Sequence, residues 1–395
     1  IIMINVIIQK YDRRLLLYFF LLGILGIIML YSASWYESFS NSNGKTDMLY
    51  LKGHLKRLIV GLFFFFIFLN IDYRSLKQIA PYLIFFSIII LIATKIIFLA
   101  KGFSWSKPAR WLYLGPFSLQ TSDIARFSVL IFMSYYVEKQ MGRLQNFKTG
   151  LFPAIVILSI IMALIIIQPD FSTAFMIGII GITILFIGGA SLSQLSLVGL
   201  FTLLVGFPIL MMRGYRRQRI ISYLPQRLMS YFGISNMEDV GYQAKQSLIS
   251  LGNGGIFGVG LGNSIEKNRL LPTPHTDFIF AIIGEELGLI LGTLPLITLF
   301  LLIFFRGLKI ARNCTDQFGV LLAVGISFNF ILYAFINVGV VTGILPVTGL
   351  PMPLVSYGGS GMVINMILIG ILLNISQSKK TLGANHGWSP IVNAK

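Results

Sequence analysis

The chain has 395 residues, of which 56% are hydrophobic and only 11% are charged, and its net charge is +17. Soluble domains usually carry about 25% charged residues, so this composition excludes a soluble globular protein and indicates a polytopic membrane protein. The basic residues stand in loops between apolar segments, which favours anionic lipid or an anionic head group as partner and not nucleic acid. The single cysteine, Cys314, excludes an internal disulfide and a cysteine-based metal site.

Ten apolar segments predict an all-α integral membrane protein with ten transmembrane helices, because about 20 residues cross the hydrocarbon core. The first segment follows three basic residues. Its apolar run is longer than that of a signal peptide and lacks a clear cleavage site, so we expect a retained span. The predicted helices are Leu15–Ala33, Leu58–Asn70, Pro81–Ala100, Ile124–Val137, Leu151–Ile167, Phe171–Gly188, Gln194–Met212, Asp277–Phe305, Phe318–Val341 and Tyr357–Ser376.

Lysine and arginine in the loops predict the orientation. The side that holds both termini carries fourteen of these residues, and the short loops of the other side carry seven. By the positive-inside rule, both termini are cytoplasmic. We expect one membrane domain over residues 1–395, with residues 1–14 and 377–395 in the cytoplasm and residues 213–276 in a large extracytoplasmic loop between the seventh and eighth helices.

A short helix and a glycine run are expected inside this large loop. The helix, Asp239–Leu251, is predicted to lie on the outer membrane surface through one apolar face. That face consists of Val240, Ala244, Leu248 and Leu251. The glycines between Gly252 and Gly262 follow no strand and precede no Lys-Ser/Thr pair, so a dinucleotide fold and a P-loop are excluded and close backbone packing is favoured.

Asp277 stands where the large loop meets the eighth predicted helix, at the boundary between membrane and water. Pro272 and Pro274 keep the approach extended, because proline fixes its own φ and disfavours helix in the residue before it. Thr276 or Asp277 is then expected to cap the helix by accepting from its free N–H groups. A general base also needs a carboxylate near substrate and partly shielded from water, so capping and catalysis both stay open.

Four arginines at the start of the large loop are candidates for binding a diphosphate, because a guanidinium group contacts two phosphate oxygens at once. Anchoring at the lipid interface explains them equally well. These residues are Arg213, Arg216, Arg217 and Arg219.

Charged residues inside predicted spans are costly and are therefore candidate functional groups. Asp123 and Arg126 are three residues apart on one helix face, and we expect them to pair. For Glu285 and Glu286 a proton relay and structural hydrogen bonds are both open. Asp170 is expected to cap the helix that follows it. A transporter and an enzyme that acts on a lipid phosphate both fit these features.

Eight short motifs occur in one order across nearly the whole chain. They are Ala109-Arg110-Trp111, Gln120–Arg126, Gln168–Ala174, Arg217-Gln218-Arg219, Gly241-Tyr242-Gln243, the glycine run, His275–Phe280 and Pro353–Gly359. Each motif is weak alone, but the ordered series is specific and resembles the SEDS family of bacterial shape, elongation, division and sporulation proteins.

Within this family, Gly258–Ser264 and Gly284–Gly288 resemble the cell-division branch, FtsW, while Leu345–Pro351 is more similar to the elongation branch, RodA. The first resemblance is the closer one. The chain departs from the family pattern at several positions, none of them in the Asp277 motif. They are Thr273 in place of a frequent glutamate, Thr121 for proline, Asp123 for glutamate, Arg126 for lysine, Ser172 for glycine and Gly361 for serine.

The resemblance implies a peptidoglycan glycosyltransferase that polymerises lipid II, a disaccharide-pentapeptide on undecaprenyl diphosphate, with inversion at the sugar. Asp277 would be the catalytic base. Substrate-binding residues would be Arg110, Trp111, Arg213, Arg216, Arg217, Arg219 and His275, and structural or relay residues would be Asp123, Arg126, Asp170, Glu285 and Glu286. No tightly bound cofactor is expected, although a divalent cation, Mg²⁺ or Mn²⁺, is compatible with Asp277.

The family also implies a place in the bacterial cytoplasmic (inner) membrane and a partner, a class B penicillin-binding transpeptidase, together with other membrane proteins of the divisome. Three alternatives stay open. They are a lipid II flippase that uses Asp123, Arg126 and Glu285 as relay charges, an elongation-type polymerase, and a non-catalytic scaffold for division enzymes.

Overall fold

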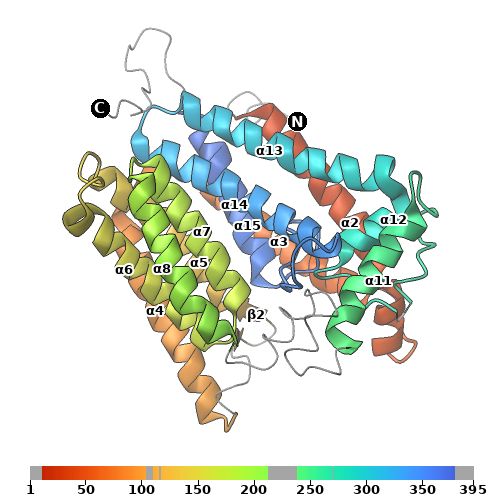
Figure 1. The fold of residues 1–395 in the computed structure, drawn as a ribbon. Helices are drawn as coiled ribbons and strands as arrows, with labels where there is room; N and C mark the ends of the chain where they lie inside the picture. Colours follow the sequence, from red (N-terminus) through yellow and green to blue (C-terminus); the bar gives the residue numbers. More distant parts are fainter. Residues whose placement is uncertain (1–10, 104–109, 115–116, 212–237, 269, 379–395) are drawn as a thin grey trace.

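The computed structural model describes residues 11–103, 110–114, 117–211, 238–268 and 270–378, and this part of the chain is almost entirely helical (Figure 1). Among the residues that the structure describes, six helical segments are long and apolar enough to cross a membrane, and two shorter helices are also apolar. The prediction of a helical, multi-pass membrane protein is therefore confirmed. The first half of the chain forms α2 (Arg13–Asn41), α3 (Leu49–Asn70), η1 (Tyr73–Ser75), α4 (Leu76–Ala100), α5 (Thr121–Lys139), η2 (Phe147–Leu151), α6 (Phe152–Ile167), α7 (Phe171–Ile187) and α8 (Leu192–Met211).

The second half forms α11 (Glu238–Gly254), α12 (Ile279–Gly288), η3 (Leu289–Thr293), α13 (Leu294–Asn313), α14 (Gln317–Val341) and α15 (Ser360–Ile375). The eighth predicted helix, Asp277–Phe305, was expected to run without a break. It is interrupted at Gly288, which adopts φ +71° before the π-helical turn η3. A Cβ at Gly288 would lie 2.3 Å from Gly258 N, so the break allows the glycine run to pack directly on this helix.

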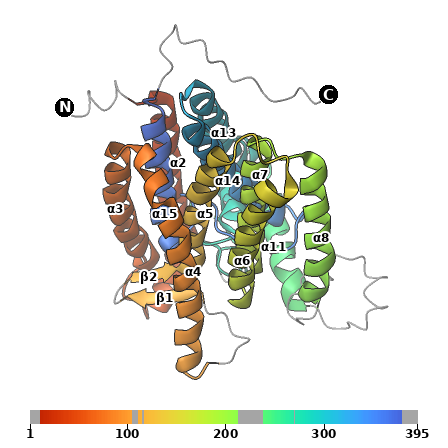
Figure 2. The ribbon, with the colours of Figure 1, turned by 90° about the vertical axis from the view of Figure 1, so that its left-hand side faces the viewer.

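The two ends of the helix bundle contain different secondary-structure elements. At one end α2 begins and α15 ends, and the backbone N–H of Asp12 donates to Ser376 Oγ at 3.1 Å. At the opposite end lies a two-stranded antiparallel hairpin, β1 (Trp111–Leu114) and β2 (Phe117–Gln120), with Trp111 opposite Gln120 (Figure 2). The sequence analysis assigned no strand here, because two strands of four residues carry too short an alternation to be recognised.

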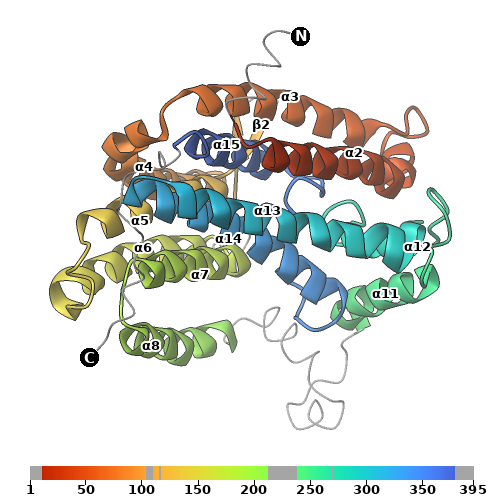
Figure 3. The same cartoon turned by 90° about the horizontal axis from the view of Figure 1, so that it is seen from above.

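Small residues set the close helix crossings in the core. A Cβ at Gly370 of α15 would lie 2.8 Å from Phe65 O of α3, and one at Gly307 of α13 would overlap Ser327 of α14. Such contacts are typical of membrane helices, where packing and not hydrophobic exclusion drives association. In the view from above, α8 lies at the edge of the molecule beside α7, and α11 lies beside α12 (Figure 3).

The helix of the large loop, α11, packs on α12 and α14 through small residues. Ser247 and Ser250 of α11 are buried and donate to Val341 O and Ala281 O, whereas Leu248 is 47% exposed. A Cβ at Gly254 would lie 2.0 Å from Gly284 O. Small residues therefore make the close contacts of α11 with α12, because backbone proximity selects small residues over bulky ones, and the contact of its apolar face with the membrane surface stays a prediction. The predicted close packing of the glycine run is confirmed by Val259 N–H, which donates to Glu285 O at 2.9 Å.

Candidate active site

Asp277 lies in a tight turn immediately before α12. Thr273 begins this turn with φ +49°, a left-handed conformation that β-branched residues rarely adopt. The hydroxyl of Thr276 donates to Asp277 Oδ1 at 2.5 Å, and the hydroxyl of Thr273 lies 3.4 Å from the same oxygen. The helix itself begins at Ile279 without any side-chain cap. The predicted capping by Thr276 or Asp277 is therefore wrong, because the turn binds the carboxylate before the helix starts.

The backbone around Asp277 is held by α14 and by the loop that precedes α15. The buried side-chain amide of Asn337 donates both to Asp277 O at 2.8 Å and to Leu350 O at 2.9 Å. The other carboxylate oxygen, Oδ2, faces Gly349, whose Cβ position would lie 3.9 Å away. The Asp277 side chain is partly exposed and makes no ion pair in the described part of the chain. A carboxylate with one fixed oxygen, one accessible oxygen and no neutralising cation is suited to accept a proton.

His275 connects the Asp277 turn to α2, α3 and the loop before α15. It is buried, and its Nδ1 lies 3.1 Å from Glu37 Oε2 of α2. Its ring packs against Tyr50, with 4.2 Å between centroids, and against Tyr357 at 5.5 Å. Its carbonyl accepts from Tyr357 N–H at 2.8 Å. The structure therefore places His275 beside Asp277 as a packed, hydrogen-bonded support of the turn.

Arg57 of α3 adds a positive charge beside this cluster. Its guanidinium lies 4.6 Å from the centroid of the Tyr357 ring, and its Nη1 is buried without a hydrogen-bond partner among the described residues. Buried polar atoms normally have partners, so this orphaned donor makes Arg57 a candidate for contact with an anionic ligand.

The β-hairpin brings Arg110 and Trp111 to the same loops. Arg110 donates to the carbonyl of Pro169, and its Nη1 lies 3.7 Å from Asp170 Oδ1. The Trp111 ring packs on Gly359, where a Cβ would lie 2.6 Å from the ring. Because Gly359 follows Tyr357 in the loop that contacts His275, the hairpin and the Asp277 turn border one region.

Asp170 has a structural role that differs from the prediction. It stands at the N-cap position of α7 but accepts no backbone N–H with its side chain. Its carboxylate instead accepts from the side chains of Gln120, Ser122 and Thr173 at 3.1, 3.1 and 2.9 Å. The predicted cap is therefore wrong, because these donors and Arg110 compete successfully for both carboxylate oxygens.

The predicted pair of Asp123 and Arg126 is confirmed at 3.3 Å inside the bundle. Asp123 also accepts from Ser360 at 2.8 Å, and Arg126 donates to Asn365 of α15 at 3.2 Å. The Arg126 guanidinium lies 4.7 Å from the centroid of the Tyr333 ring. Each charge therefore has fixed partners from neighbouring helices, which favours structural hydrogen bonding over a mobile relay.

Glu285 and Glu286 also have structural partners, from segments far away in the sequence. Glu285 accepts from Ser250 at 2.9 Å, from Ser264 at 2.5 Å and from the N–H of Ile265 at 3.0 Å. Of the two interpretations that stayed open, a proton relay and structural hydrogen bonds, the geometry favours the second for Glu285.

Glu286 forms an ion pair with Lys267 of the large loop at 2.6 Å, with side-chain exposures of 0% and 1%. Ser32 of α2 donates to both oxygens of Glu286, at 2.7 and 2.6 Å. Next to this pair, burial and the neighbouring Glu285 carboxylate raise the pKa of Glu266. The pair fastens the loop to two helices.

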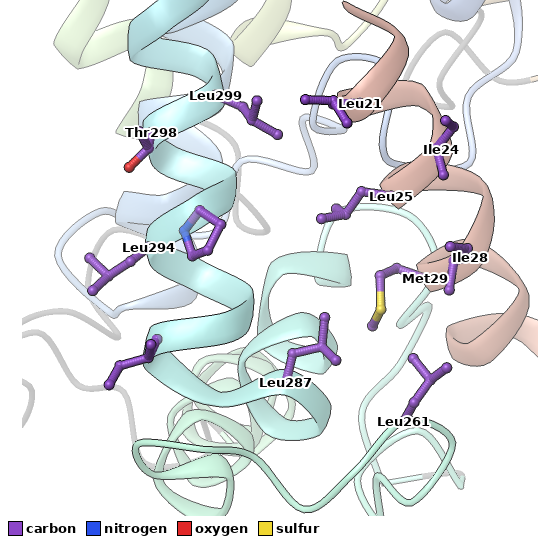
Figure 4. A pocket seen from close by; sticks show the side chains of 12 residues that line it. Leu21, Ile24, Leu25, Ile28, Met29, Leu261, Leu287, Leu294, Thr298 and Leu299 are labelled. Atoms are coloured by element: carbon purple, nitrogen blue, oxygen red, sulfur yellow. The ribbon is translucent and has the colours of Figure 1, made fainter. Parts of the chain in front are cut away.

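An apolar groove of about 820 Å³ opens between α2, α12 and α13. Leu21, Leu25 and Met29 of α2 face Leu287 of α12 and Leu299 of α13 across it (Figure 4). Its lining is apolar except for Thr298, so it is suited to hydrocarbon chains and not to a sugar.

Arg213, Arg216, Arg217 and Arg219 lie outside the described residues. Among the residues that the structure describes, no group of three or more His, Cys, Asp and Glu side chains is arranged to hold a metal ion. Asp277 itself offers one carboxylate to such an ion.

Three residues at the site were missed by sequence reasoning. Arg57 was counted only as a loop charge, while Lys267 and Glu37 were not considered. Glu37 pairs with His275, and Arg57 lies against Tyr357. Lys267 pairs with Glu286. The partners in each pair are too far apart in the sequence for a helix-spacing rule to connect them.

Comparison with known proteins decides the family. The model of the FtsW/RodA/SpoVE family, described as a cell cycle protein, matches residues 12–381. The chain belongs to this family. A probable peptidoglycan glycosyltransferase FtsW of Geobacter sulfurreducens (strain DL-1 / KN400) is 34% identical to it over 376 residues, which cover 94% of this chain and 97% of the relative. Stage V sporulation protein E of Bacillus subtilis (strain 168) is 34% identical over 372 residues, with 93% and 97% coverage.

Solved structures share the fold of this FtsW/RodA/SpoVE protein. The rod shape determining protein RodA of Thermus thermophilus superposes with a TM-score of 0.66 at 22% identity, covering 94% of this chain and 98% of RodA. A chain from a structure described as "Structural coordination of polymerization and crosslinking by a peptidoglycan synthase complex" reaches a TM-score of 0.71 at 23% identity, with 93% and 97% coverage.

Proposed function

We propose that Asp277 is the general base with which this chain, a peptidoglycan glycosyltransferase of the FtsW type, polymerises lipid II. The observation that carries the proposal is the geometry of the carboxylate. Two threonine hydroxyls hold Oδ1, Oδ2 faces Gly349, and no cation of the described residues neutralises it. Relatives named as probable peptidoglycan glycosyltransferases align over nearly the whole chain.

In the proposed step, Asp277 takes the proton from the 4-hydroxyl of the acceptor sugar as that oxygen attacks the anomeric carbon of the donor. The bond from this carbon to the diphosphate breaks, and undecaprenyl diphosphate leaves with the electron pair. The anomeric centre inverts from α to β because attack and departure occur on opposite faces. A base fixed by hydrogen bonds on one oxygen keeps the other aimed at the attacking hydroxyl.

Positive groups near the turn would bind the diphosphate on which charge develops. Arg57 supports this role through its orphaned Nη1 beside Tyr357. Arg110 and Trp111 are proposed for the sugar-diphosphate region from the hairpin, together with the four arginines that open the large loop. Mg²⁺ or Mn²⁺ fits the donor set, because Mg²⁺ is commonly held by one or two carboxylates and substrate phosphates. Such an ion would neutralise the leaving diphosphate.

The test compares the purified wild type, Asp277→Asn and Asp277→Glu in a lipid II polymerisation assay with a transpeptidase partner and a divalent cation. We expect no glycan polymer from Asp277→Asn and reduced polymer from Asp277→Glu, because only the second retains a base. The matched control is Asp47→Asn, which changes a partly exposed carboxylate in the loop between α2 and α3. Full polymerisation by Asp277→Asn, at wild-type folding, would exclude the proposed base.

The same preparations in vesicles separate a polymerase from a flippase. Movement of lipid II across the bilayer without polymer, and without an effect of Asp277→Asn, would favour transport. The fixed partners of Asp123 and Arg126 do not support a mobile relay, so the polymerase is the better supported function.

We also propose the finer topology of a single membrane domain with ten spans, cytoplasmic termini and residues 213–276 outside. Support comes from the ten predicted spans, each of which coincides with a helical segment, and from the contact of Asp12 with Ser376. The single native cysteine makes a test direct. In a Cys314→Ser background, a cysteine placed at Lys45 should react with an impermeant thiol reagent from outside, and one placed at Arg143 should not.

A class B penicillin-binding transpeptidase and other divisome membrane proteins are the proposed partners. Support comes from the fold shared with a chain of a peptidoglycan synthase complex. Identifying the transpeptidase that co-purifies with the chain would separate a division role from an elongation role.

A further inference from the structure

A second pocket, of about 520 Å³, lies at the end of the bundle where α2 begins and α13 ends. The charged residues that line this pocket are four basic residues and one carboxylate. We call the pocket the basic pocket. These residues are Arg13, Arg14, Arg306, Lys309 and Asp12. It is far along α13 from the turn of Asp277, since a whole membrane-length helical segment separates Ile279 from Asn313.

The single carboxylate of the basic pocket, that of Asp12, already forms an ion pair. Asp12 Oδ1 and Oδ2 both accept from Arg306 Nε at 2.8 Å, and Oδ2 lies 2.7 Å from Arg306 Nη2. Asp12 also caps α2 by accepting from the N–H of Leu15 at 3.0 Å. Arg14 and Lys309 are exposed and form no ion pair with the rest of the described chain. The pocket therefore presents uncompensated positive charge.

The apolar groove of Figure 4 is lined by the same two helices, α2 and α13, that line the basic pocket. Arg14 and Leu21 are separated by about 10 Å along α2, because an α-helix rises about 1.5 Å per residue. In the sequence, Leu17 of α2 and Phe305 of α13 stand between the pocket residues and the groove residues, and these two apolar side chains are exposed, at 55% and 59%. The surface along α2 and α13, which we call the seam, thus has a cationic pocket at one end and an apolar groove farther along the same helices.

We propose that this seam binds an anionic phospholipid, with its phosphate in the basic pocket and its acyl chains along the groove. This lipid belongs to the membrane leaflet at the end of the bundle that holds the basic pocket. Guanidinium and ammonium groups bind phosphate oxygens, and basic pockets between helices at a membrane surface are suited to lipid head groups. A soluble phosphate would use only the cationic end and would leave the adjoining apolar surface without a role.

The test measures binding of tail-labelled phosphatidylglycerol and phosphatidylcholine with identical chains to the purified full-length protein in detergent. We expect the wild type to prefer phosphatidylglycerol. Arg14→Gln/Lys309→Gln should lose about 30-fold in affinity for it, since each basic residue near a lipid surface contributes about 1 kcal/mol. Arg143→Gln/Arg312→Gln removes two exposed charges outside the pocket and should bind as the wild type does.

Two further measurements distinguish a phospholipid from free phosphate as the ligand. Thr298→Trp places a large ring in the groove and should weaken binding of the long-chain lipid while the preference for its anionic head group remains. Inorganic phosphate at the same concentration should displace little lipid. Equal binding of both lipids, an equal loss in the control pair, no effect of Thr298→Trp, or full displacement by inorganic phosphate would each overturn the proposal.

Discussion

The ion pair between Lys267 and Glu286 offers a quantitative test of how the large loop is attached to the bundle. Both side chains are at most 1% exposed, and Ser32 donates to both oxygens of Glu286. Lys267 Nζ also donates to Gly262 O at 2.7 Å. Replacing Lys267 by methionine keeps an unbranched side chain that is one heavy atom shorter and removes its charge, which leaves the Glu286 carboxylate buried without its cation.

Removing one partner of a buried ion pair typically costs about 3–5 kcal/mol, because the remaining charge is desolvated and uncompensated. Unfolding entropy is about 2.1 cal/mol/K per residue, so for 395 residues this cost lowers the melting temperature by about 4–6 °C. Glu286→Gln should be affected similarly, since it orphans the ammonium group. Lys267→Met/Glu286→Leu should recover most of the loss, because two apolar side chains of similar volume need no counter-charge.

The assay is thermal unfolding of the purified variants in one detergent, followed by circular dichroism or by reaction of buried Cys314 with a thiol dye. Lys245→Met is the matched control, because Lys245 is an exposed lysine of α11 in the same loop. If Lys267→Met melts within about 1 °C of the control, or if the double variant is less stable than both single variants, the buried pair does not fasten the loop as argued.

Three further predictions concern neighbouring groups. Glu266→Gln should leave stability near pH 4 unchanged and raise it at pH 7, because the raised pKa of Glu266 means that its contribution to folding is lost as pH rises above about 4.3. Melting temperatures from about pH 4 to pH 7.5 check this, and a constant difference between variant and wild type would contradict it. Glu37→Gln should reduce polymerisation several-fold with little change in melting temperature, since it removes the carboxylate beside His275 Nδ1; an unchanged rate would show that this contact does not position the turn. Gly258→Ala should destabilise by more than about 1 kcal/mol, because Gly258 has φ +83° and its Cβ would lie 2.3 Å from Glu286 O; a wild-type melting temperature would refute the close approach.

Local sequence patterns were sufficient to predict the membrane helices, because hydropathy over about 20 residues is a property of each segment alone. The predicted span Phe318–Val341 differs from α14 by one residue at its start. The pairing of Asp123 with Arg126 could also be predicted from the sequence, since a spacing of three residues places two side chains on one helix face. By contrast, the caps expected of Asp170 and Asp277 failed, because side-chain donors outcompete the helix N–H groups. For Asp170 two of these donors, Gln120 and Ser122, come from a remote segment, whereas for Asp277 they are the threonines of its own turn.

The sequence by itself determined that this protein is a helical membrane protein of the FtsW/RodA/SpoVE family and that Asp277 stands at the start of a membrane helix. Only the tertiary structure decided what surrounds that carboxylate. Asn337 and Gly349 enclose its turn, and His275 supports it through Glu37. These contacts join segments that lie tens to hundreds of residues apart. Hydropathy and helix periodicity are set by neighbours in the chain, whereas the pairing of buried polar groups is set by which helices pack together.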